Sequence, residues 1–376
     1  MAQQLELIAG CYEQIVFGYR VQTGEKKWTS DADFSHHAHT ASLSAVAVND
    51  RYIATGSKDE TIQLYDIKKR VEYGSLLHHD GTISCLEFYG KTHLLSGGED
   101  GLICVWSTKK WECLKSFRAH KGHVTSLSVH PSGKIVLSVG TDKTLRTWNL
   151  IDGRSAFIKN IKQNAHIVMW SPTGERYVVV VNEKMDIYNL ETATVTGTIS
   201  NKKRISSIRF ITNTIVVVAG DEETVRLYDT DSLKCLCEFK AHENRVKAIY
   251  SITVGETLVL VTASSDGYIK MWKLDLEKIQ DTPALLGEVN TSARLTCLGV
   301  WQGSPVEGSQ QVEAEAACSQ VQPSREETQR EHKDHTTEED SIKLVRNKKV
   351  EFVEDKIATK KRKAEETKKK KKRKSE

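Results

Sequence analysis

The chain has 376 residues, with 54 basic and 50 acidic side chains and a formal net charge of +4, and this length leaves ample room for a buried core. Its longest apolar runs, such as Tyr177 to Val181 and Ile215 to Ala219, are too short to span a bilayer, and the N-terminus has neither the basic start nor the apolar stretch of a signal peptide. The eight cysteines form no C-x-x-C pair and no zinc-ligand spacing, which favours reduced thiols in a soluble intracellular protein.

The chain begins with three segments that we expect to be strands, 5–9, 13–21 and 28–34. The second contains Tyr19, the first of a series of aromatic residues that close short apolar strands at a period of about 40 residues. The series is Tyr19, Tyr65, Trp106, Trp148, Tyr188, Tyr228 and Trp272. A turn residue stands six positions before each: Glu13, Asp59, Asp100, Asp142, Asn182, Glu222 and Asp266. Many short strands at this period predict a closed array of four-stranded blades.

Pairs of residues at the repeat ends resemble those of the WD-repeat β-propeller family, whose repeats run from a Gly-His-like pair to a Trp-Asp-like pair. The matching pairs are Ala38-His39 with Tyr65-Asp66, His78-His79 with Trp106-Ser107, Ala119-His120 with Trp148-Asn149, and Ala241-His242 with Trp272-Lys273. The resemblance implies an all-β fold, a propeller whose blades are the repeats.

The same resemblance implies a structural hydrogen-bond network of histidine, hydroxyl, aspartate and aromatic side chains in four repeats. The four sets are His39, Thr55, Asp59 and Tyr65; His79, Ser96, Asp100 and Trp106; His120, Ser138, Asp142 and Trp148; and His242, Thr262, Asp266 and Trp272. The two repeats without the histidine carry Val178 and Val218 in place of the hydroxyl. We expect the histidine and the hydroxyl to be lost together, because a buried hydrogen-bond network with unsatisfied members is less stable than an apolar one.

The seventh repeat is expected to be split between the two ends of the domain. Residues 293–300 match the innermost strand of a repeat, and the three N-terminal segments supply its other strands. Such closure removes free sheet edges. We therefore predict a seven-bladed propeller over residues 1–301, closed by N- and C-terminal strands that share one blade.

The residue three positions after each repeat histidine should line one mouth of the central channel. Around the ring these residues are Ser42, Thr82, His123, Asn164, Arg204, Arg245 and Arg294. The three arginines would form a basic arc opposite a small polar arc. The candidate partner-binding residues are Arg204, Arg245, Arg294, His123 and Asn164, suited to an acidic peptide, a phosphorylated segment or a nucleic-acid backbone. The alternative is solvated arginines paired with nearby acids such as Asp221, Glu222 and Glu243.

Catalysis and cofactor binding find little support in the sequence. No phosphate-binding loop occurs, and Gly56 and Gly97-Gly98 are assigned to tight turns of the repeat. Histidines gather in three groups, but one member of each is already assigned to a structural network, and the turn aspartates are interpreted as structural too. We expect no enzyme activity, no metal ion and no cofactor.

Beyond the propeller the charges separate. Residues 302–341 hold 3 basic and 10 acidic residues, a net charge of −7, and predict a disordered linker. Residues 342–376 hold 16 basic and 6 acidic residues, a net charge of +10. The basic tail contains two blocks: Lys360, Lys361, Arg362 and Lys363, then Lys368, Lys369, Lys370, Lys371, Lys372, Arg373 and Lys374. Such blocks indicate nuclear or nucleolar targeting, or salt-sensitive RNA contact with little sequence specificity.

Several segments of the ring resemble more narrowly the p21-activated kinase-interacting WD-repeat proteins. They are Leu7 to Gln14, Ser57 to Ile62, Gly140 to Leu150, Arg154 to Ala165 and Phe239 to Lys247. This resemblance implies a scaffold that restrains a p21-activated kinase by binding its regulatory region and helps assemble the large (60S) ribosomal subunit in the nucleolus. It implies as partners pre-60S ribosomal proteins and pre-rRNA, and gives no reason to expect a membrane or self-association.

Two other functions remain open. Substrate receptors of ubiquitin ligases often carry Trp-Asp-x-Arg after a repeat, and the best match here, Tyr65-Asp66-Ile67-Lys68, departs at both ends. An enzyme of unrecognised chemistry is the third hypothesis.

Overall fold

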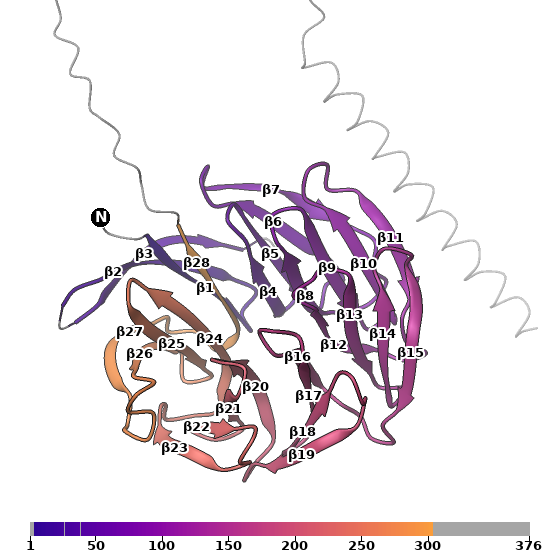
Figure 1. Cartoon of the computed structure of the whole chain (residues 1–376). Coiled ribbons are helices and arrows are strands. Elements are labelled where there is room, and N and C mark those ends of the chain that lie inside the picture. Colours follow the sequence, from indigo (N-terminus) through magenta and orange to yellow (C-terminus); the bar gives the residue numbers. More distant parts are fainter. Residues whose placement is uncertain (1–3, 26, 38, 304–376) are drawn as a thin grey trace, which may run out of the picture. The chain divides into compact units, whose positions relative to one another are not determined.

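The computed structural model describes residues 4–25, 27–37 and 39–303. These residues form 28 β-strands in seven four-stranded sheets (Figure 1), which confirms the predicted all-β propeller. None of their segments forms a helix with the length and apolar character needed to cross a membrane. The predicted linker beyond residue 303 and the basic tail lie outside the described residues.

The strands follow one another blade by blade. The blade that holds both ends consists of β28 (Leu295–Gln302), β1 (Leu5–Cys11), β2 (Val16–Gln22) and β3 (Thr29–His36). The others are β4 (Leu43–Val48), β5 (Tyr52–Ser57), β6 (Ile62–Asp66) and β7 (Val71–Leu76); β8 (Ile83–Tyr89), β9 (His93–Gly98), β10 (Leu102–Ser107) and β11 (Cys113–Arg118); β12 (Val124–Val129), β13 (Ile135–Gly140), β14 (Thr144–Asn149) and β15 (Arg154–Asn160); β16 (Ile167–Trp170), β17 (Arg176–Val181), β18 (Lys184–Asn189) and β19 (Val195–Ser200); β20 (Ile205–Phe210), β21 (Ile215–Gly220), β22 (Thr224–Asp229) and β23 (Cys235–Lys240); and β24 (Val246–Val254), β25 (Thr257–Ser264), β26 (Tyr268–Leu274) and β27 (Ala284–Asn290).

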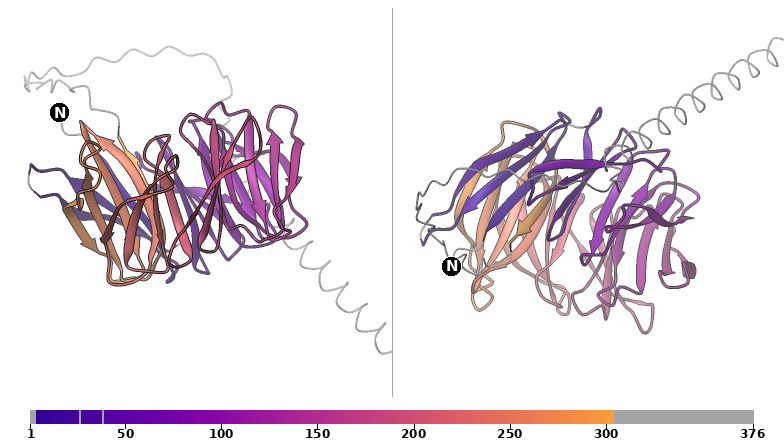
Figure 2. Two further views of the ribbon diagram at one scale, coloured as in Figure 1. Left: turned by 60° about the horizontal axis from the view of Figure 1, so that its bottom comes forward. Right: turned by 90° about the horizontal axis from the view of Figure 1, so that it is seen from above.

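The first strand of each of the six continuous blades, and β28 in the split blade, faces the centre of a ring. Each innermost strand contacts that of the next blade, and β28 contacts both β24 and β4; side views show the blades stacked around this ring (Figure 2). β1 pairs antiparallel with β28, from Leu5 opposite Gln302 to Cys11 opposite Leu295. The predicted closure is thus confirmed, and the last strand runs one residue beyond the predicted boundary at Trp301.

Burial differs with the position of a strand in its blade. Every residue of β1 and β5 is buried, because a second strand is covered on both faces by neighbouring blades. β4 alternates buried and half-buried residues, whereas outer strand β7 is exposed except at its last residue. The apolar side chains therefore gather in clusters between blades, and their removal from water is the main favourable term in folding.

A β-bulge precedes the repeat aromatic in all seven sheets that the described residues form. At each one the third strand loses register with the outermost strand, as between Val105 and Trp106 or between Leu227 and Tyr228. Because a bulge adds one unpaired residue and turns the strand locally, it sets which outer-strand side chains lie beside the aromatic ring.

The prediction that three glycines lie in tight turns is wrong. Gly56 lies in β5, and Gly97 and Gly98 lie in β9. A Cβ on Gly56 would come within 2.5 Å of Ile83, and one on Gly97 within 2.7 Å of Cys85. Both residues of contact belong to the innermost strand β8, so these glycines allow close packing against it, and no turn requires them there.

Candidate functional site

Four blades carry a continuous hydrogen-bond chain behind the loops that enter the innermost strands. In each, histidine Nε2 lies 2.8 Å from a hydroxyl and Nδ1 lies within 3.1 Å of an aspartate. In three of them the tryptophan Nε1–H donates to the same hydroxyl at 2.9–3.0 Å; buried Tyr65 replaces the tryptophan in the other. A carboxylate can only accept, so Nδ1 carries the proton and Nε2 accepts from the hydroxyl.

These chains also hold the loops at the channel mouth. The aspartate accepts the backbone N–H of the residue after the histidine in all four, for example Lys121 N to Asp142 at 3.1 Å. Burial lowers the pKa of His120 and of His242. Burial alone would raise the pKa of Asp142, but hydrogen bonds from Thr144 and His120 lower it to about 2. The chains of His120 and His242 therefore each pair a neutral histidine with a charged aspartate.

The blade of β20–β23 uses a different chemistry, which the sequence analysis missed. Arg226 is only 3% exposed; it binds Glu222 through two nitrogens and donates to Asn201 Oδ1 at 2.5 Å. Asn201, which stands where other repeats have histidine, donates to Glu222 at 3.0 Å and accepts from Tyr228. Burial would raise the pKa of Glu222, but its contacts with Arg226 leave it below the usual value.

The three arginines of the predicted basic arc are placed by the loops before three innermost strands. Arg204 precedes β20, Arg245 precedes β24 and Arg294 precedes β28. Arg204 and Arg294 are exposed and Arg245 is half-buried. None forms a salt bridge with another described residue; the Arg294 guanidinium lies 5.3 Å from the ring centre of Tyr12.

The acids considered as partners for these arginines are bound to other cations. The pairs are Glu222 with Arg226, Glu243 with Lys240 (Oε2 to Nζ, 2.7 Å), and Asp221 with Lys247 (Oδ1 to Nζ, 3.8 Å). Among the described residues, none of these three acids forms a salt bridge with an arginine of the predicted arc.

Lys247 is a fourth cation at this place, and the sequence analysis missed it. It follows Arg245 by two residues and lines the channel. Burial lowers its pKa, and the positive charges of Arg245, Arg294 and Arg204 lower it further. All three arginines thus act electrostatically on one ammonium group, and they immediately precede three innermost strands, β20, β24 and β28, that contact one another in that order. Lys247 lies at the bulge between Val246 and Ala248 in β24, so simple strand alternation gives no signal for it.

The rest of the mouth and the channel are less charged. His123 and Asn164, predicted with the arginines as partner-binding residues, are exposed in the loops before β12 and β16. Below them the channel encloses about 720 Å³. Inside it, Glu87 accepts the backbone N–H of Val129 at 3.1 Å, and burial raises its pKa to about 8 although Arg209 opposes this.

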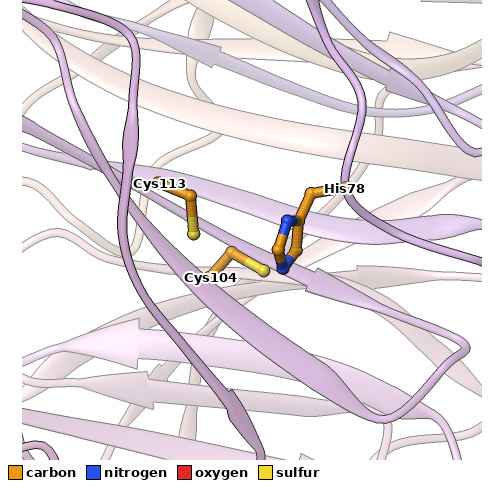
Figure 3. Close-up of side chains that lie close together, drawn as sticks. All are labelled: His78, Cys104 and Cys113. Carbon is orange, nitrogen blue, oxygen red and sulfur yellow. The ribbon is translucent and has the colours of Figure 1, made fainter. Parts of the chain in front are cut away.

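One group of metal-ligating side chains occurs among the described residues, on the outer side of the β8–β11 blade. His78, Cys104 and Cys113 place their ligand atoms within 4.8 Å of one another (Figure 3). No metal ligand was predicted there.

The fold and the repeats define the class of protein, and comparison with protein families agrees. The WD40 model, described as "WD domain, G-beta repeat", matches residues 31–66, 71–107, 111–149 and 233–273. These are the four repeats that contain the histidine chains. The molecule is a WD40-repeat β-propeller.

Similar proteins narrow the class to one family. A Xenopus laevis protein named "p21-activated protein kinase-interacting protein 1-like" is 62% identical, covering 91% of this chain and 95% of its own. The human "p21-activated protein kinase-interacting protein 1" is 57% identical over 79% and 77%. "Shk1 kinase-binding protein 15" of Schizosaccharomyces pombe is 28% identical over 84% and 90%. The chain belongs to the family of p21-activated protein kinase-interacting protein 1, whose members are named for interaction and not for catalysis.

Proposed function

We propose that this propeller is a non-catalytic scaffold that binds the regulatory region of a p21-activated kinase and restrains the kinase. The names of the similar proteins support the choice of partner. The observation that carries the proposal is the set of cations at the channel mouth, Arg204, Arg245, Arg294 and Lys247. The three arginine guanidinium groups form no salt bridge with described residues, and all three act electrostatically on Lys247.

Such a surface suits an acidic segment. Guanidinium groups donate in a fork that matches carboxylate and phosphate oxygens. A rigid ring holds the three arginines at a fixed spacing, so little ordering is required of this side of the interface when a partner binds.

The test compares two triple variants with the unchanged protein in binding the kinase regulatory region. Replacing Arg204, Arg245 and Arg294 by Ala should weaken binding at least about tenfold and relieve kinase restraint in the same proportion. Replacing the exposed cations Arg154, Lys184 and Lys234, which form no salt bridge with described residues, is the charge-matched control and should have little effect. Equal binding by both variants would refute the assignment of this surface.

We propose a second role in assembly of the large ribosomal subunit in the nucleolus, with the two lysine blocks as targeting and pre-rRNA contacts. The blocks lie outside the described residues, and their charge supports the proposal. Ending the chain after Gly303, whose N–H donates to Gln4 O at 2.9 Å, leaves the ring whole. That shortened protein should lose nucleolar accumulation and salt-sensitive RNA binding; if it keeps both, the proposed role of the blocks is wrong.

A further inference from the structure

We propose that His78, Cys104 and Cys113 bind one thiophilic d10 metal ion, Zn²⁺ or Cu⁺. Their three ligand atoms lie within 4.8 Å of one another. Cys104 is buried in β10, Cys113 is half-buried in β11, and His78 is exposed in the connection from β7 to β8. In Figure 3 the imidazole and both sulfurs point toward a common centre.

The fold, and not sequence spacing, makes this cluster. Trp106 pairs with Cys113 across the bulge, while Cys104 pairs with Ser116. Cys104 and Trp106 are two residues apart on one strand and so share a face, and the His78 ring lies edge-on to Trp106 with centroids 5.9 Å apart. Without the bulge the outer strand would shift by one residue, and Cys113 would face away from Cys104.

The donor set suits soft cations. Thiolate ligands select Zn²⁺ and Cu⁺, and imidazole accepts either. With Zn–S near ~2.3 Å and Zn–N near ~2.0 Å, ligand atoms of a tetrahedral site lie roughly 3.7 Å apart. The ligand atoms of the present cluster lie within 4.8 Å of one another, so binding requires them to move closer by about 1 Å at most. Binding forms two metal–sulfur bonds and one metal–nitrogen bond, and the two thiol protons pass to solvent.

Two further contacts fit this assignment. The Cys104 thiol donates to Ser116 Oγ at 3.5 Å, and the Cys113 thiol donates to the Lys115 carbonyl at 3.4 Å. After deprotonation the Ser116 hydroxyl can donate to the Cys104 thiolate instead, which orients a metal-bound sulfur. Three protein ligands leave a fourth position on the His78 side for water or a partner's side chain.

The molecule contains a matched control in another blade. Cys235 pairs with Tyr228 in β22–β23 as Cys113 pairs with Trp106 in β10–β11. The residue equivalent to Cys104 in that blade is Arg226, so Cys235 occupies the same strand position without the other two ligands. A metal site made by the cluster needs Cys113 and not Cys235.

The experiment titrates the reduced full-length chain with Zn²⁺ against a chromophoric chelator, and separately with Cu⁺ under anaerobic conditions. The unchanged protein should bind one equivalent in at least one arm, and the arm that responds identifies the ion. Co²⁺ substitution should give a thiolate charge-transfer band. His78→Ala and Cys113→Ser should each weaken binding at least about tenfold, while Cys235→Ser should not.

His78 is exposed, so His78→Ala leaves the core intact, and an unchanged thermal transition of the metal-free variant verifies this. Failure of the unchanged protein to compete with the chelator in both arms overturns the proposal. Undiminished affinity in both ligand variants, or loss of affinity only in Cys235→Ser, overturns it too.

Discussion

In the blade of β12–β15 the buried position behind the loop is held by neutral His120, whereas in the blade of β20–β23 it is held by Asn201 and the charged Arg226. The third blade to compare, β16–β19, has neither: Tyr188 stacks on Tyr177 with ring centroids 4.9 Å apart, and Lys159 lies over the Tyr188 ring. Blades of the same backbone fold thus contain three different sets of side chains at this position.

The difference matters at the channel mouth. In the β20–β23 blade Glu222, in the turn between β21 and β22, forms its salt bridge with Arg226 and none with exposed Arg204 or half-buried Arg245. The buried Arg226–Glu222 pair therefore leaves the neighbouring loop surface basic. In a histidine chain the only charged group is the aspartate.

The largest expected effect comes from Arg226→Ala, which leaves Glu222 partly buried without its cation. Breaking such a pair costs about 3–5 kcal/mol of unfolding free energy, measurable by urea denaturation. The control is Arg146→Ala at the equivalent position of β14, where the more exposed Arg146 binds Asp142 at 3.1 Å; it should cost no more than about 1 kcal/mol. Equal losses would mean that the two blades do not differ as described.

Removing the shared hydroxyl of a histidine chain should have a smaller effect. Ser138→Ala deprives both His120 Nε2 and Trp148 Nε1 of their partner, at a cost of about 1–3 kcal/mol. The reciprocal change, Val218→Ser, places a hydroxyl where the β20–β23 blade has no histidine to receive it, and it should destabilise too. Stabilisation by Val218→Ser in urea titrations would contradict the idea that the network parts are useful only together.

Lowering the pH should weaken the histidine chains before it weakens the Arg226–Glu222 pair. The folded-state pKa of His120 and of His242 lies below the usual 6.5. Their contribution to the free energy of unfolding is therefore complete above pH 6.5 and is lost as the pH falls from 6.5 toward the lowered values. Glu222 has a pKa below 4.5, so its contribution is lost only below that pH. Urea midpoints between pH 7.5 and 5 should therefore fall in the unchanged protein and fall less in His120→Asn. An equal pH dependence in both proteins would contradict this.

Much of the ring was predictable because its signals repeat. The aromatic residues and turn residues recur once per blade, and the match of residues 293–300 to an innermost strand anticipated the pairing of β1 with β28. Arg226, Lys247 and the Cys104–Cys113 cluster were not anticipated, because each depends on which side chains face each other across strands. The bulge before every repeat aromatic alters that register, and no residue type in the sequence marks it.

The smallest expected effect concerns Lys247, whose pKa is lowered first by burial and further by the positive charges of Arg245, Arg294 and Arg204. Lys247→Met should raise the free energy of unfolding by less than about 1 kcal/mol, and the thermal unfolding temperature slightly, because like charges at the channel mouth repel. The same variant should weaken binding of the acidic partner, which distinguishes relief of repulsion from simple improvement of packing. A lower unfolding temperature would show that the pair with Asp221 outweighs the repulsion.

The pairing of β1 with β28 also has a consequence for biosynthesis. Glu13 accepts the backbone N–H of Arg294, 281 positions later in the chain. At ~5–20 residues per second, that interval of translation lasts roughly 15 to 55 s. During this interval the edge of β1 that later pairs with β28 has no partner strand. The growing polypeptide therefore exposes unpaired backbone groups to which another chain could pair. A chaperone that protects the growing chain would therefore have to cover the free edge of β1 until β28 has been synthesised.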